Sequence, residues 1–134
     1  MERIRAAVAR ARIATIDDEA PVRVALARLL RLAAYEVTSF DSGEAFLASL
    51  AVSCPDCVIV DIHMPGMNGF EVANRLRAAN IDLPVVLITA SDDAALDAAA
   101  RAAGAVQLLR KPFPGDQLLA AVAEALARRP SGGP

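Results

Sequence analysis

Short apolar runs alternate with segments of helical periodicity along this chain, and this alternation limits the possible folds more than any other feature. The runs predict five strands, at residues 12–16, 35–40, 57–60, 83–88 and 105–109. The other segments predict helices at residues 21–34, 68–79, 92–103 and 114–129, with a shorter helix that starts at 41–43. Strands that are apolar almost throughout, each followed by a helix, indicate an α/β fold with a parallel sheet covered on both faces.

Several residues mark where the predicted helices begin and end. Pro21 suits a first helical turn, and Asn68 is expected to be an N-cap because its side chain can accept a hydrogen bond from an early helical amide. Gly104 predicts the end of the helix at 92–103, because glycine adopts the left-handed conformation found just after many helices. That helix is rich in alanine, with Leu96 as its one large apolar residue, so we expect it to be loosely anchored.

The composition indicates one compact domain and excludes several functional classes. The chain has 134 residues, of which 55% are hydrophobic, and this suits a single core. Its formal net charge is -2 and its arginines form no basic stripe, so we expect no direct nucleic-acid binding. No apolar stretch approaches the roughly 20 residues that span a bilayer, and the first residues lack the apolar segment of a signal peptide. We therefore expect a cytoplasmic protein with no membrane insertion.

The two cysteines, Cys54 and Cys57, form a Cys-x-x-Cys pair. A zinc site needs four ligands, and a redox pair normally precedes a helix, whereas this pair precedes a strand. We expect buried or strand-edge thiols without a chemical role, since free cysteine behaves as a small hydrophobic residue.

Chemically reactive side chains follow four of the apolar runs. Asp17 and Asp18 follow the first run, Asp61 the third, Thr89 the fourth and Lys111 the fifth. With right-handed crossovers, the carboxyl ends of parallel strands lie at one edge of the sheet, where open α/β sheets hold their functional sites. If the strand order is 2-1-3-4-5, the first and third strands are neighbours and the three carboxylates meet in one crevice.

Three carboxylates in one crevice repel one another unless a cation joins them. Hard oxygen ligands with room for water suit Mg²⁺ better than a transition metal, so the pattern predicts Mg²⁺. Lys111 can neutralise a remaining charge, and the Thr89 hydroxyl can donate a hydrogen bond to an oxyanion. Because an aspartate can be the nucleophile in phosphoryl transfer, Asp61 is the best placed acceptor of a phosphoryl group.

Four ordered motifs carry a resemblance to a known family. They are Ile16-Asp17-Asp18-Glu19, Asp61 with Met64-Pro65-Gly66-Met67-Asn68-Gly69, Thr89-Ala90, and Lys111-Pro112-Phe113. Together they resemble the response-regulator receiver domain of two-component signalling, over residues 12 to 127, and the ordered set is far more specific than any one motif. The resemblance implies a doubly wound (βα)5 fold of flavodoxin-like receiver type, with a five-stranded parallel sheet in the order 2-1-3-4-5.

The resemblance also implies a metal site. Asp18, Asp61 and the backbone carbonyl of His63 would bind Mg²⁺ directly, and Asp17 would act through water.

The phosphoryl site is implied in the same way. Asp61 would be the residue that is phosphorylated, and Lys111 would pair with the phosphoryl group. Thr89 would bind a phosphoryl oxygen when the loop after the fourth strand closes. The peptide bond before Pro112 would be cis, which is accessible because an X–Pro bond prefers trans by only about 0.5–1 kcal/mol.

Three further positions bear on how such a receiver would work. The His63 side chain and Ser91 are candidates for tuning hydrolysis of the phosphoryl group; alternatively, they are a solvated loop side chain and a cap or loop residue. Leu108 stands three residues before Lys111, where many receivers carry an aromatic switch residue. The aromatic readout is therefore not expected, although leucine could still repack, and phosphorylation should not depend on it.

The expected partners follow from the resemblance. A histidine kinase or phosphotransfer protein would dock near the helix at 21–34, and phosphorylation would shift the surface formed by 92–103, 105–109 and 114–129. That surface would meet an output domain, a partner protein or a second copy in a phosphorylation-dependent homodimer.

The expected organisation is a lead at 1–11, a receiver domain at 12–129 and a flexible tail or linker at 130–134. Either a single-domain regulator or the receiver of a longer regulator fits, and the Arg110-Lys111-Pro112-Phe113 motif resembles receivers that precede helix-turn-helix output domains.

Two other functional classes share features with this sequence. A phosphatase of the haloacid-dehalogenase type needs a second acid two residues after its nucleophilic aspartate, where this chain has His63, so we expect no turnover of phosphomonoesters. A phosphorylation-independent interaction module on the same fold is the alternative reading, and the complete set of acidic, hydroxyl and lysine residues argues against it. The chain is therefore expected to be a signalling receiver, and an enzyme only in assisting its own phosphorylation and dephosphorylation.

Overall fold

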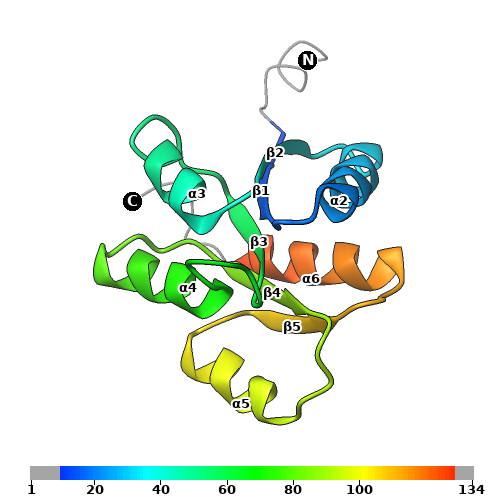
Figure 1. The fold of residues 1–134 in the computed structure, drawn as a ribbon. Coiled ribbons are helices and arrows are strands. Elements are labelled where there is room, and N and C mark those ends of the chain that lie inside the picture. The colour runs from blue at the N-terminus through cyan, green and yellow to red at the C-terminus, as the bar shows by residue number, and fades with distance from the viewer. Residues whose placement is uncertain (1–9, 129–134) are drawn as a thin grey trace.

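A five-stranded parallel sheet forms the centre of the molecule. The computed structural model describes residues 10–128. The sheet has the order β2-β1-β3-β4-β5, as predicted (Figure 1). Its strands are β1 (Arg12–Ile16), β2 (Glu36–Phe40), β3 (Cys57–Asp61), β4 (Val85–Thr89) and β5 (Gln107–Arg110). Most of the predicted lead at 1–11 and all of the predicted tail at 130–134 lie outside the described residues.

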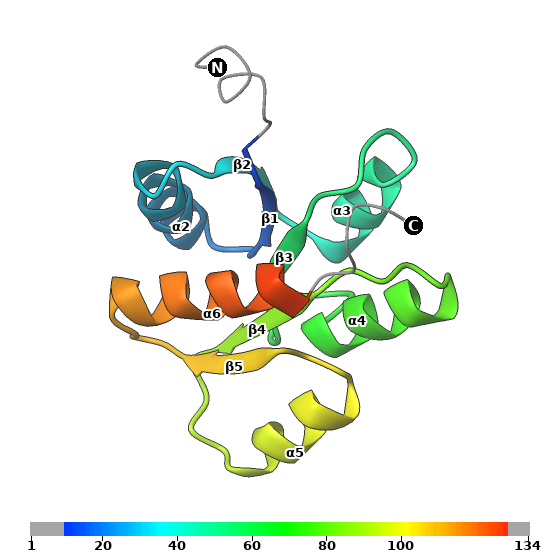
Figure 2. The same ribbon diagram turned by 180° about the vertical axis from the view of Figure 1, so that it is seen from behind.

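Helices cover both faces of this sheet. They are α2 (Ala20–Leu32), α3 (Gly43–Ser49), α4 (Gly69–Ala78), α5 (Ala95–Ala102) and α6 (Gly115–Arg128). Figures 1 and 2 show α2 and α6 together on one face, and α3, α4 and α5 on the other. Among the described residues, no helix is long and apolar enough to cross a bilayer.

Each face of the sheet has its own apolar cluster, because side chains alternate between the faces along each strand. Phe46 of α3 and Leu76 of α4 pack with Val58 and Leu87 on one face. Leu30 of α2 and Leu118 of α6 pack on the other, with residues that include Ile13, Ile59, Val86, Ile88 and Leu109. β3 and β4 are buried throughout, which explains their continuous apolar sequences.

Two predicted helix boundaries are confirmed, one at a helix start and one at a helix end. The Asn68 side chain accepts a hydrogen bond from the Glu71 amide at 2.9 Å, and the Glu71 carboxylate accepts one from the Asn68 amide at 2.8 Å. This reciprocal capping box fixes the start of α4 directly after the loop that follows Asp61. Gly104 has φ +80°, as its position after α5 predicted.

The predicted start of the helix at 92–103 is wrong. α5 begins at Ala95. The Ser91 hydroxyl accepts a hydrogen bond from the Asp93 amide at 3.1 Å, and the Asp93 carboxylate accepts one from Ala95 at 2.9 Å. These local side-chain bonds hold residues 91–94 outside the helix and compete with helix formation.

Several other boundaries differ by one or two residues. β4 and β5 start two residues later than predicted and end one residue later, at Thr89 and Arg110. Pro84 cannot donate a ladder hydrogen bond, although its carbonyl accepts one from Val58 at 3.0 Å. The shifted ends place Thr89 and Asp61 as the last residues of adjacent strands.

Candidate functional site at the carboxyl ends of the strands

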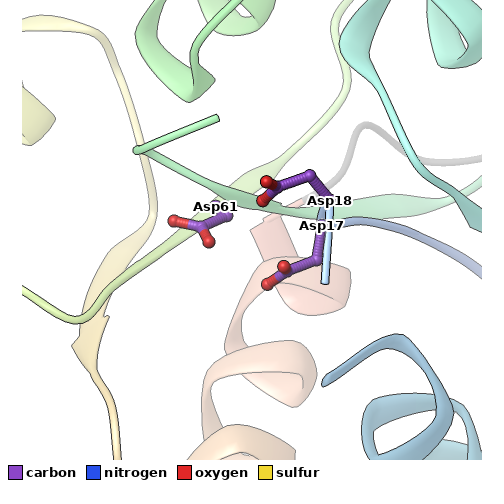
Figure 3. Close-up of side chains that lie close together, drawn as sticks. All are labelled: Asp17, Asp18 and Asp61. Atoms are coloured by element: carbon purple, nitrogen blue, oxygen red, sulfur yellow. The ribbon is translucent and has the colours of Figure 1, made fainter. Parts of the chain in front are cut away.

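The predicted meeting of three carboxylates is confirmed. β1 and β3 pair directly, with Ile16 opposite Val60, so the residues that follow β1 lie beside the end of β3. Asp17, Asp18 and Asp61 each offer a carboxylate oxygen, and these three oxygens lie within 4.8 Å of one another (Figure 3). The sheet order alone brings the three together, although positions 17 and 61 are 44 positions apart in the sequence.

These carboxylates differ in their exposure. Asp17 is fully buried and Asp61 is 5% exposed, whereas Asp18 is exposed. Burial raises the pKa of Asp17, and the nearby charge of Asp61 adds to this effect, while hydrogen bonds from the Glu19 amide and Lys111 oppose it. The ionised form of Asp17 is therefore disfavoured in the folded protein, and a nearby cation would stabilise it.

Lys111 joins the two buried carboxylates. Its Nζ lies 3.1 Å from Asp17 Oδ2 and 3.0 Å from Asp61 Oδ2. Burial, the largest influence, disfavours the charged ammonium, but the hydrogen bonds and charges of Asp61 and Asp17 together raise the pKa of Lys111. Lys111 is also the only lysine in the chain. With one ammonium against three carboxylates, the cluster retains excess negative charge when its acids are ionised.

In each buried carboxylate, the oxygen that does not contact Lys111 accepts a hydrogen bond from the backbone of its own loop. Asp61 Oδ1 accepts a hydrogen bond from the His63 amide at 3.0 Å, and Asp17 Oδ1 accepts one from the Glu19 amide at 3.0 Å. One oxygen of each acid is therefore fixed by the backbone and the other by Lys111. The His63 side chain itself is exposed, as expected of a loop residue.

Gly69 brings the start of α4 against the strand that carries Asp61. A Cβ atom at this position would lie 2.8 Å from the Asp61 carbonyl oxygen and 3.1 Å from Ile62 Cα. The backbone atoms around the acceptor leave no room for a side chain, so glycine is required here by close approach.

Thr89 lies at the site's edge, but its hydroxyl is turned to its own loop. Thr89 is fully buried, and its Oγ1 accepts a hydrogen bond from the Ser91 amide at 3.0 Å. The Lys111 amide donates to the Thr89 carbonyl at 2.7 Å, which ties the ends of β4 and β5 together. Among the described residues, the Thr89 side chain has no hydrogen bond to the three carboxylates. The Ser91 hydroxyl bonds within the loop, in agreement with a loop role.

The contacts that two arginines make at the site were not anticipated from the sequence. Arg23 Nη1 donates to the Asp17 carbonyl at 2.7 Å, and Arg110 binds the loop after Thr89. The sequence did hold a signal for Arg110, because consecutive strand residues point to opposite faces of the sheet. Arg110 and Lys111 are adjacent at the end of β5, so their side chains are expected to point to different sides and to bind different partners.

Comparisons with known proteins agree with this geometry. The response regulator receiver domain family matches residues 13–123. The transcriptional regulatory protein FixJ of Bradyrhizobium diazoefficiens is 39% identical over 114 residues, which cover 85% of this chain and 56% of that protein. This chain belongs to the response-regulator receiver family.

Other receivers and regulators support the assignment. The response regulator MprA of Mycobacterium sp. strain KMS is 39% identical over 120 residues, covering 90% of this chain and 52% of that protein. The crystal structure of FixJ-N has a TM-score of 0.84 at 31% identity, covering 90% of this chain and 97% of that chain. A putative response regulator from Chloroflexus aurantiacus has a TM-score of 0.83 at 34% identity, covering 89% and 99%. This chain spans only about half the length of the curated relatives FixJ and MprA.

Two positions in and after β5 bear on the resemblance to receivers. The Lys111–Pro112 peptide bond is cis, as the resemblance implied. Leu108 is partly buried and packs on the face of the sheet that α5 covers. The position that is aromatic in many receivers therefore holds an aliphatic side chain in contact with the core.

The cysteines form no disulfide. Cys57 is buried at the start of β3, and burial raises the pKa of its thiol to about 12. The expected burial is confirmed for Cys57, whereas the expectation of burial or a strand edge is wrong for Cys54, which is exposed in the preceding loop.

Proposed function

We propose that this receiver accepts a phosphoryl group on Asp61 from the phosphohistidine of a histidine kinase or phosphotransfer protein. The observation that carries the proposal is the fixed geometry of Asp61. Its carboxylate is 5% exposed at a strand end, beside two further acids, with one oxygen on a backbone amide and the other 3.0 Å from Lys111.

The transfer needs few groups from the protein. A carboxylate oxygen of Asp61 attacks phosphorus, the bond from phosphorus to the donor imidazole nitrogen breaks, and the imidazole leaves with that electron pair. An acyl phosphate results, and the protein contributes positioning and charge neutralisation. Lys111 supplies a positive charge beside the acceptor oxygen, where it can follow the added phosphoryl oxygens.

The acidic cluster fits Mg²⁺. Three carboxylates at one small site supply the hard oxygen ligands that this ion prefers. The pKa of Asp17 is raised by burial and by its charged neighbour, and a bound cation would offset both effects. Asp18, Asp61 and the backbone carbonyl of His63 would hold it directly, with Asp17 acting through water. When bound, the ion supplies positive charge that neutralises the transferring phosphoryl group.

Thr89 and Leu108 would connect phosphorylation to a change of surface. Closure of the loop after β4 would bring the Thr89 hydroxyl to a phosphoryl oxygen, where it can donate a hydrogen bond. The new contact would favour one of two arrangements of the surface that α5, β5 and α6 form, with Leu108 repacking beneath it. An output domain, a partner protein or a second phosphorylated copy would read that surface.

A groove beside the site suits the phosphoryl donor. It lies between α2 and the start of α6, and its apolar lining includes Val22, Leu26, Leu29 and Phe113 together with Lys111. A helix of the donor placed in this groove would bring its phosphohistidine to the mouth of the site. The phosphoryl donor is therefore proposed to dock on α2.

The wider context follows from the longer relatives. FixJ is a transcriptional regulatory protein, and NtrC of Salmonella typhimurium is a DNA-binding transcriptional regulator that matches over 24% of its length. We propose that residues 12–129 form the receiver unit of a cytoplasmic phosphorelay, in which the output is made by another domain or protein and the receiver itself binds no nucleic acid. Its only catalysis would be assistance to its own phosphorylation and dephosphorylation.

Incubation with acetyl phosphate tests the proposal. Intact mass is measured with MgCl2 or with EDTA, for the wild-type chain and for Asp61→Asn. One phosphoryl adduct that requires Mg²⁺ and is lost in the variant is expected. No adduct under any condition would instead favour the phosphorylation-independent module, and steady release of phosphate from added phosphomonoesters would indicate a phosphatase.

A further inference from the structure

Arg110, the last residue of β5, makes hydrogen bonds to three residues between Thr89 and the first turn of α5. Arg110 Nε donates to the Ser91 carbonyl at 3.2 Å, and Nη2 donates to the Asp93 carbonyl at 2.8 Å. The same guanidinium binds both carboxylate oxygens of Asp97, from Nη1 at 3.1 Å and from Nη2 at 3.2 Å. The planar fork of arginine is suited to this bidentate geometry, which lysine cannot reproduce.

This segment, residues 91–97, and the rest of α5 make few apolar contacts with the core. Ala100 is the one buried residue of α5, and Leu96 is partly buried against the core. Residues 92–95 are exposed. The expected loose anchoring of this helix is therefore correct for its apolar contacts, and Arg110 supplies a polar attachment in their place.

The attachment is connected to the phosphoryl site through the backbone. Arg110 pairs with Thr89 in the register of β4 and β5, and the next amide, that of Lys111, donates to the Thr89 carbonyl. Ser91, whose carbonyl Arg110 binds, donates its own amide to Thr89 Oγ1. Any displacement of Thr89 with its loop must therefore strain or break bonds to Arg110.

We propose that Arg110 is a positioning residue that clamps the loop after Thr89 in the observed arrangement and opposes its closure over a phosphoryl group. This inference deepens the proposed function, since it assigns control of that site's switching to Arg110 and Asp97. Weakening the clamp lowers the cost of closure, so a phosphoryl group or its analogue binds more tightly. Lys111, directly after β5, would attract the phosphoryl group, while the preceding residue, Arg110, restrains the loop that has to close over that group.

The first measurement is amide hydrogen exchange of the unligated chain. Arg110→Gln removes all four hydrogen bonds, and Asp97→Asn weakens the two to the carboxylate. Arg101→Gln is the matched control, because Arg101 is exposed on α5 and near Asp97, but its side chain makes no hydrogen bond among the described residues. Faster exchange at residues 91–97 in the first two variants, with β1, β3 and the control unchanged, is expected. Unchanged exchange in Arg110→Gln would overturn the clamp.

The second measurement is the affinity for beryllofluoride with Mg²⁺, an analogue of the phosphoryl group. Arg110→Gln is expected to bind it roughly three- to tenfold more tightly, as one charged surface contact and its accompanying hydrogen bonds allow. Arg110→Lys, which keeps the charge but loses the fork, should lie between Arg110→Gln and wild type. Equal or weaker binding by Arg110→Gln, with an unchanged Tm, would overturn the inference.

The two measurements distinguish a failure of this inference from a failure of the proposed function. If the wild-type chain takes up neither beryllofluoride nor a phosphoryl group, the proposed function fails and the switching role falls with it. Hydrogen exchange would still show whether Arg110 holds the loop.

Discussion

Replacing Lys111 by methionine is expected to destabilise the fold substantially, because it leaves Asp17 and Asp61 without their shared cation. Removing one partner of a buried ion pair costs about 3–5 kcal/mol. The Lys111 side chain is 18% exposed, while those of Asp17 and Asp61 are 0% and 6% exposed. Partial solvation of the ammonium places the expected loss in the free energy of unfolding at about 2–3 kcal/mol, which lowers Tm by about 6–9 °C in a chain of this size.

The loss should depend on pH in a defined direction. The pKa of Asp17 is raised by burial already in the wild type, and without Lys111 it rises further. A carboxyl group whose pKa is higher in the folded state stabilises the fold below its unfolded pKa, and this stabilisation is lost as pH rises through the folded value. The deficit of Lys111→Met is therefore smallest near pH 4 and grows towards pH 7.

At alkaline pH the two proteins should converge. The raised pKa of Lys111 means that its contribution to stability is complete below the ordinary lysine pKa and is lost as pH rises through the folded value. Wild type should therefore lose its advantage above about pH 10.4.

Urea unfolding in EDTA at pH 4 and pH 7 measures this effect. Arg128→Met is the control, since it breaks an exposed pair with Glu124 and should cost only about 0.3–0.5 kcal/mol. The double variant Asp17→Asn with Lys111→Met should recover part of the loss. A deficit under about 1 kcal/mol at pH 7, or one that does not change with pH, would show that Lys111 does not stabilise the buried carboxylates in this way.

Three further predictions concern the surroundings of the site. Gly69→Ala should cost about 1–3 kcal/mol and slow phosphorylation, because the new Cβ would lie 2.8 Å from the Asp61 carbonyl oxygen; unchanged urea midpoint and phosphorylation rate would contradict this. A thiol reagent should modify Cys54 quickly and Cys57 only on unfolding, since burial raises the pKa of Cys57 to about 12, and two fast equivalents would contradict it. MgCl2 at 100 times its Kd should stabilise the chain by about 2.7 kcal/mol in thermal unfolding, and a full effect in Asp18→Asn would place the ion elsewhere.

Periodicity in the sequence was sufficient for the fold class and for placing the acids at one edge of the sheet, because both depend on simple periodic rules. Apolar runs with intervening helices determine a parallel sheet, and the strand ends then place Asp17 and Asp61 at one edge. The sheet order itself came from the resemblance to receivers, since periodicity does not choose between doubly wound topologies.

Other parts of the site depend on contacts that have no period. The start of α5 is set by Ser91 and Asp93, whose side chains bond to the loop backbone in place of a helical turn. Arg110 reaches Asp97 across 13 positions, through a loop whose path no repeat pattern predicts. The direction of the Thr89 hydroxyl likewise depends on the amide of Ser91. Such contacts become visible only when the loop conformation is known.

The position of the phosphoryl group on the chain decides whether Asp61 is the acceptor. Borohydride reduces an acyl phosphate to an alcohol, so a phosphorylated aspartate becomes homoserine and can be located by peptide mass mapping after treatment with acetyl phosphate and Mg²⁺. We predict homoserine at position 61 alone. Homoserine at Asp17 or Asp18, or a phosphoryl group that resists borohydride on the Thr89 hydroxyl, would contradict the assignment of Asp61 as the acceptor.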